Sequence, residues 1–106
     1  MIVLVELRVN GMAKDILTII EGLKDQASQK YKAEIKGIFG SYVRGNQTSE
    51  SDIDVLVDFH RDADLFDFVG LSLFLEEHLG HKVDVVPLSS LREEIRDYVM
   101  NEVVYL

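Results

Sequence analysis

Two short motifs between two predicted strands constrain this chain more than any other feature. Gly40-Ser41 follows the apolar run that ends at Phe39, and Ser51-Asp52-Ile53-Asp54 opens a second run, rich in β-branched residues. This composition predicts strands at 35–39 and 53–59. The chain must therefore leave one strand, pass through a glycine turn and a polar loop, and enter the next strand with two carboxylates at its start.

The two carboxylates are two residues apart. Residues at that spacing in a strand point to the same face, so Asp52 and Asp54 point to one side and leave the other side for the apolar Ile53, Val55 and Val57. Two neighbouring like charges raise each other's pKa unless a cation lies between them. Because carboxylate oxygens are good ligands for Mg²⁺ and Mn²⁺, the pair predicts a divalent metal site.

The Gly-Ser pair suits a phosphate group. Gly40 lets the backbone approach a ligand closely. Ser41 adds a hydroxyl and a backbone N–H near a predicted helix start, where phosphate binds readily. A phosphate cradle next to an acidic metal site indicates phosphoryl or nucleotidyl transfer.

Nine residues separate Gly40-Ser41 from Ser51-Asp52-Ile53-Asp54, and this spacing resembles the signature of the DNA polymerase β-like nucleotidyltransferase superfamily. The string 39–57 is most similar to its minimal nucleotidyltransferases, which are single small domains of about this size. The resemblance is strongest over 35–58 and extends more loosely to Asp84. It implies a single α/β (α+β) domain in which a small mixed sheet carries packed helices.

The resemblance also implies a reaction, the transfer of a nucleoside monophosphate from an NTP, with ATP the expected donor, to an acceptor hydroxyl. The implied catalytic residues, which would also bind Mg²⁺ or Mn²⁺, are Asp52, Asp54 and Asp84. The implied nucleotide-binding residues are Gly40, Ser41, Arg44 and Ser51.

Two of these residues have plainer interpretations. Asp84 lies in the predicted strand 82–87, and taken alone it would be a solvent-facing acid on a half-buried strand. Beside the motif, it is better interpreted as the third carboxylate of the family. Arg44 lies four residues after Gly40 and could contact a triphosphate, or it could be a solvated surface arginine.

Length and charge set further limits. The 106 residues fit one domain, 1–106. A formal net charge of −8 argues against strong nucleic-acid binding, which depends on cations. The chain has no cysteine, which fits a cytoplasmic protein, and no apolar run long enough to span a membrane.

Periodicity predicts the remaining elements, namely a possible extra N-terminal strand within 1–11, an amphipathic helix at 12–31, and further helices at 65–79 and 91–101. The helix at 12–31 places Ile16, Ile19, Ile20, Leu23 and Ala27 inward, and the helix at 91–101 places Leu91, Ile95, Tyr98 and Val99 inward.

The three histidines, His60, His78 and His81, show no metal-binding spacing and are predicted to have no catalytic role.

Two apolar segments leave room for partners. The helix at 65–79 is apolar most of the way round, so it is either mostly buried or covered by a partner. The apolar end, 103–106, is either an extra strand or a contact between copies of the chain.

The resemblance implies a biological role as well. Minimal nucleotidyltransferases are often paired with a HEPN-type ribonuclease toxin, and act as its antitoxin by adenylylating a tyrosine. The main alternative is an antitoxin that neutralises its partner by binding alone. Adenylylation of a small molecule is a third possibility, but it usually requires an extra substrate domain.

Overall fold

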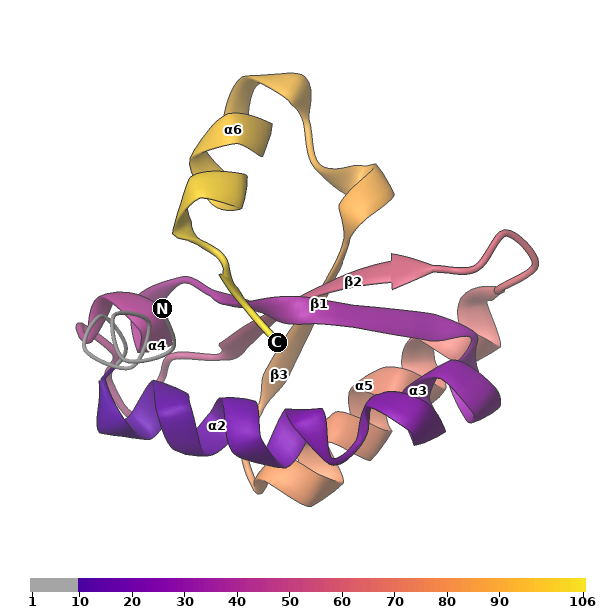
Figure 1. Cartoon of the computed structure of the whole chain (residues 1–106), viewed down its shortest axis with the longest axis horizontal. Helices are drawn as coiled ribbons and strands as arrows, with labels where there is room; N and C mark the ends of the chain where they lie inside the picture. Colours follow the sequence, from indigo (N-terminus) through magenta and orange to yellow (C-terminus); the bar gives the residue numbers. More distant parts are fainter. Residues whose placement is uncertain (1–9) are drawn as a thin grey trace.

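The computed structural model describes residues 10–106, so the strand predicted at the N-terminus lies outside the described residues. Along the chain the elements are α2 (Gly11–Glu21), α3 (Lys24–Tyr31), β1 (Ala33–Phe39), α4 (Ser41–Arg44), β2 (Ile53–Phe59), α5 (Leu65–Leu79), β3 (Val83–Pro87), the 3-10 turn η1 (Leu88–Ser90), α6 (Glu93–Glu102) and β4 (Val104–Tyr105). Figure 1 shows α2, α3 and α5 together on one side of the sheet and α6 on the other.

The strands of this described part form one four-stranded mixed sheet in the order β3-β2-β1-β4. β1 runs antiparallel to both β2 and β4, whereas β2 and β3 are parallel. A parallel pair needs a long crossover, and α5 provides it. The predicted α/β fold, a small mixed sheet with packed helices, is therefore confirmed.

The two faces of the sheet carry different cores because successive residues of a strand point to opposite sides. One face packs against α2, α3 and α5, where Val55 and Val57 join Leu71 and Leu75 in the main core. On the other face, Leu56 packs against Val99 and Val103. The helix α6 stands over this second face (Figure 1). β2 therefore has apolar residues buried on both sides, with Val55 and Val57 on one and Leu56 on the other.

The single helix predicted at 12–31 is wrong, because the structure has two helices joined at Gly22 and Leu23. The N–H of Gly22 bonds to Thr18 at 3.4 Å, and the N–H of Leu23 forms a tighter bond to Ile20 at 2.9 Å, so the helix ends there. The apolar spacing continues through the break, since Ile16, Ile20, Leu23 and Ala27 are all buried. Periodicity alone could therefore not reveal the break between the two helices. Ile19, which was expected to point inward, is exposed.

The helix α5 has the predicted bounds. Asp64 and Asp67 form a capping box at its start, and Gly80 ends it in the left-handed conformation. Its apolar surplus remains on the surface, where Leu65, Phe66, Val69 and Leu73 are exposed.

The last helix differs from its prediction. It begins at Glu93, and Ile95 and Tyr98, both expected to face the core, are 49% and 64% exposed. Only Val99 of α6 is buried, because the helix meets the sheet over a narrow contact around Leu56.

The segment after α6 forms β4, which pairs with Gly37 and Ile38 of β1. The extra strand predicted at the chain end is confirmed, and a contact between copies stays a prediction. Within residues 10–106, none of the helices has the length and apolar character needed to cross a membrane.

Candidate active site

The short helix α4 follows Gly40, whose φ of 84° is a conformation that side chains disfavour. The N–H groups of Val43 and Arg44 both bond to the carbonyl of Gly40 at 3.0 Å, which closes the turn. Asn10 holds the turn from outside, since its side-chain amide donates to the carbonyl of Tyr42 at 2.8 Å. Asn10 also caps α2, so two helices meet at this residue.

Gly40 lies against an acidic side chain. A Cβ built on Gly40 would fall 2.0 Å from Oδ2 of Asp54 and 3.0 Å from its Cγ. The sequence predicted that glycine here leaves room for phosphate. The structure adds a second reason, because the carboxylate of Asp54 occupies the space that any side chain at position 40 would need.

The carboxylates predicted from the sequence come from neighbouring strands. Asp54 of β2 is paired in register with Asp84 of β3, so the two side chains lie on the same face of the sheet. Asp54 is half-buried, whereas Asp84 and Asp52 are exposed. This is the face on the α6 side of the sheet, opposite to the main core.

Burial raises the pKa of Asp54 to about 6, and the nearby charges of Asp84 and then Asp52 add to the rise. Arg44 acts in the opposite direction. Asp84 and Asp52 are therefore both close enough to raise the pKa of Asp54. The environment of Asp54 disfavours its charged form, as is common for carboxylates at catalytic and ligand-binding sites.

The donor chemistry of this acid group fits a divalent cation. Mg²⁺ is commonly bound by one or two carboxylates together with substrate phosphates and water, and Asp54 and Asp84 provide such a pair. Among residues 10–106, however, no three His, Cys, Asp or Glu side chains are grouped closely enough to hold a metal ion unaided. The pair therefore fits a cation that takes its remaining ligands from a bound phosphate and water.

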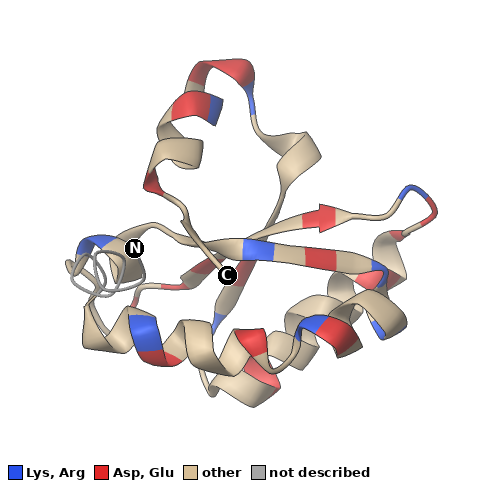
Figure 2. Cartoon of the chain, viewed as in Figure 1, with Lys and Arg blue, Asp and Glu red and all other residues tan. Residues whose placement is uncertain are grey.

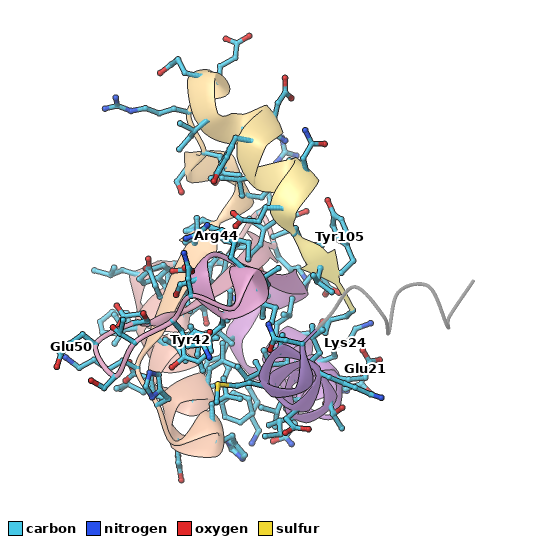
Figure 3. All side chains as sticks on the ribbon, turned by 90° about the vertical axis from the view of Figure 1, so that its left-hand side faces the viewer. Glu21, Lys24, Tyr42, Arg44, Glu50 and Tyr105 are labelled. Atoms are coloured by element: carbon cyan, nitrogen blue, oxygen red, sulfur yellow. The ribbon has the colours of Figure 1, made fainter. Side chains whose placement is uncertain are left out.

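Arg44 has a partner that the sequence did not suggest. Its guanidinium forms an ion pair with Glu102 at the end of α6, and the Glu102 side chain is only 13% exposed. Figure 3 shows Arg44 on the side of α4 that faces α6. The Arg44 side chain is 43% exposed, so a solvated surface arginine and a phosphate contact both stay predictions. In a phosphate contact, a triphosphate would have to share Arg44 with Glu102.

Ser51 holds the turn that leads into the acidic strand. Its hydroxyl accepts a bond from the N–H of Thr48 at 2.9 Å, and its carbonyl accepts a bond from His81 at 2.7 Å. The same His81 nitrogen lies 2.9 Å from the hydroxyl of Tyr42. Sequence reasoning missed both Tyr42 and His81, although each directly adjoins a predicted site element.

A hollow of about 250 Å³ opens beside Asp52, and it is lined by Ser49, Glu50, Ser51, Asp52, His81 and Lys82. Every residue of this lining is polar. The hollow lies where the chain enters β2, and Asp52 is the member of the acid group that lines it.

Comparison with known proteins agrees with this geometry. Residues 17–106 match the model of the nucleotidyltransferase domain family. The protein adenylyltransferase MntA of Thermococcus cleftensis is 40% identical over 93 residues, which cover 88% of this chain and 94% of that protein.

Two solved structures have the same fold. A proposed minimal nucleotidyltransferase superposes with a TM-score of 0.74 at 31% identity, and the match covers 92% of this chain and 99% of that chain. A toxin–antitoxin complex with AMP-PNP contains a chain that superposes with a TM-score of 0.65 at 29% identity, covering 85% of this chain and 70% of that one.

Proposed function

The chain belongs to the nucleotidyltransferase domain family, and from this premise we propose that it is a protein adenylyltransferase that moves AMP from ATP to a hydroxyl of a partner protein. The observation that carries the proposal is the half-buried Asp54, paired with Asp84 and lying against Gly40. The similarity to the protein adenylyltransferase MntA supports the choice of a protein as acceptor.

In the proposed reaction, the acceptor oxygen forms a bond to the α-phosphorus of ATP. The bond from that phosphorus to the bridging oxygen of the β-phosphate breaks, and pyrophosphate leaves. Gly40, Ser41 and Ser51 would hold the phosphates, joined by Arg44 when Glu102 shares it. Mg²⁺ or Mn²⁺ held by Asp52, Asp54 and Asp84 would stabilise negative charge on both the attacking and the leaving oxygens.

A tyrosine of a HEPN-type ribonuclease toxin is the acceptor that we propose, so that its modification makes this chain an antitoxin. The toxin–antitoxin complex found among the similar structures supports a protein partner of this kind. A phenol has a pKa of about 10, so its proton must be removed as the bond forms. The exposed Asp84 is the proposed acceptor of that proton.

The position of the acids narrows where such a partner can dock. The exposed apolar residues of α5, including Phe66 at 86% exposure, lie on a helix that covers the face opposite to Asp54. The exposed Ile95 and Tyr98 belong to α6, which lies on the Asp54 side of the sheet. We therefore propose that the acceptor docks on the α6 side, whereas the sequence pointed to the helix at 65–79 as the surface for a partner.

The α6 side also carries charge that can select a partner. Figure 2 shows acidic residues on α6. Glu102 is paired with Arg44, while Glu93, Glu94 and Asp97 outnumber Arg96 on the rest of the helix. A partner with basic residues around the acceptor tyrosine would match this surface.

The second candidate function is an antitoxin that only binds. The observation that favours it is the apolar surface of α5, which lies away from the acids and could hold a partner without bringing it to them. In that case the nucleotide site would not act on the partner.

One experiment separates the two functions. The chain is incubated with Mg²⁺, ATP labelled in its α-phosphate and a co-expressed HEPN-type partner, and the partner is examined by mass spectrometry. We expect AMP on a tyrosine, absent with Asp54→Asn and retained with Asp58→Asn, which removes an exposed acid from the same strand. A partner that is neutralised but unmodified would support the binding-only function.

A further inference from the structure

His81 links two segments that are far apart in the sequence. It follows Gly80, which ends α5, and lies just before β3. Its ring faces the ring of Tyr42 edge-on, with the centroids 5.6 Å apart. The histidine therefore lies between the short helix α4 and the loop that enters β2.

The hydrogen bonds determine which ring nitrogen carries a proton. The carbonyl oxygen of Ser51 can only accept, and it lies 2.7 Å from Nε2 of His81. Nε2 must therefore be protonated and donate to Ser51. The hydroxyl of Tyr42 lies 2.9 Å from the same nitrogen, so Ser51 and Tyr42 share this one N–H donor.

Each partner of His81 adjoins one half of the proposed site. Ser51 directly precedes Asp52, and Tyr42 directly follows Ser41. Tyr42 is 7% exposed and is fixed in turn by Asn10, which bonds to its carbonyl. The bond from His81 to Ser51 consequently ties the loop of the acids to a residue that is itself held in the core.

We propose that His81 is a positioning residue, which sets the spacing between the phosphate-side turn at Gly40-Ser41 and the acids at the start of β2 through its bonds to Ser51 and Tyr42. The catalytic part of this inference rests on the proposed function. The Gly40-Ser41 turn would hold the phosphates and the acids would hold the metal ion, so a change in the spacing of the two halves would weaken nucleotide binding and slow transfer.

Three substitutions test the role. His81→Ala removes the donor, His81→Gln restores an N–H at similar reach, and His60→Ala is the matched control, since His60 pairs with the exposed Glu34 at the other end of β2. Calorimetry with Mn²⁺ and a non-hydrolysable ATP analogue should show about tenfold weaker binding for His81→Ala. Binding should return to within about threefold for His81→Gln and stay unchanged for His60→Ala.

A second measurement does not depend on catalysis. Amide hydrogen exchange without nucleotide should quicken in 46–52 and in α4 for His81→Ala, and slow again for His81→Gln. If the wild type transfers AMP to no acceptor, the proposed function fails, while exchange and analogue binding still decide whether His81 positions the site.

The inference is overturned if His81→Ala binds the analogue as tightly as the wild type, or if His81→Gln loses as much as His81→Ala. If circular dichroism shows that His81→Ala does not fold, Tyr42→Phe replaces it. This change removes only the hydroxyl that contacts His81. Analogue binding about twofold to threefold weaker is then expected, and unchanged binding overturns the inference.

Discussion

The carboxylate of Asp54 occupies the space that a side chain on Gly40 would need, with its Oδ2 only 2.0 Å from an ideal Cβ at that position. The two halves of the sequence motif are therefore in direct contact. A change at either residue is expected to act through the other.

The first prediction concerns that contact. Gly40→Ala should weaken binding of Mn²⁺ and an ATP analogue about as much as Asp54→Asn, because the new methyl group displaces the carboxylate. The double variant should lose little more than either single variant, since residues in contact are not additive. Calorimetry on all three variants gives the comparison, and fully additive losses would mean that the two residues act separately.

Stability measurements supply a control for Gly40. Gly80 also has a positive φ, of 64°, but a Cβ there would meet nothing within 4 Å. Gly80→Ala should cost about 1–2 kcal/mol from backbone strain alone, and Gly40→Ala should cost more. Urea unfolding of both variants measures the difference, and equal losses would argue against a collision with Asp54.

A second prediction concerns pH. The pKa of Asp54 in the folded state is about 6, whereas that of an unfolded Asp is about 3.9. A raised folded pKa means that protonation of Asp54 favours the fold, a contribution present at low pH and lost as the pH rises through the folded value. Asp54→Asn, which cannot ionise, should therefore be more stable than the wild type at pH 7.5 by about 1 kcal/mol, allowing for solvent screening.

Urea unfolding of both proteins between pH 4 and pH 7.5 checks this, and their difference should shrink toward zero at the acidic end. Asp58→Asn controls for the removal of one charge from a chain of net charge −8. If Asp54→Asn were less stable than the wild type at every pH, the ionised carboxylate of Asp54 would not be lowering the stability of the fold.

A third prediction concerns the ion pair of Arg44 and Glu102. Glu102→Gln should tighten binding of an ATP analogue about twofold to fivefold, since it frees the guanidinium and removes a negative charge near the phosphates. Glu34→Gln makes the same change of charge at the exposed pair with His60 and should have no such effect. If Glu102→Gln weakened binding instead, the ion pair would be holding the site in its binding form.

The fourth prediction locates the partner. Ile95→Ser and Tyr98→Ser, on exposed residues of α6, should raise the partner concentration needed for half-maximal modification by about tenfold. Phe66→Ser, on α5, should not. Titration of a co-expressed partner with labelled ATP measures this, and the reverse pattern would move the docking surface to α5.

The elements closest to the motif were predictable because local composition determines them. β2 and α5 have the predicted bounds, and α5 has both its capping box and its terminal glycine in the sequence. The break at Gly22 was not predictable from periodicity, since the apolar residues on either side of it keep one helical face.

The site was predictable only where its residues are close in sequence. Asp52 and Asp54 were paired by strand alternation, although β2 begins only at Ile53. The register that places Asp84 beside Asp54 depends on the whole crossover. The partners of Arg44 and His81 lie 58 and 30 residues away, and no local pattern connects them. The exposure of Ile95 and Tyr98 depends on how far α6 stands from the sheet, and the sequence of the helix alone does not determine that distance.

The outer strands of the sheet limit how any other molecule can attach to this one. β4 is two residues long, while β3 ends in a proline and has its first N–H bonded to the side chain of Glu76 at 3.1 Å. Within the described chain, neither edge therefore presents a long row of backbone groups onto which a foreign strand could pair. Recognition must then depend on side chains, so that specificity can change by single substitutions while the sheet remains the same.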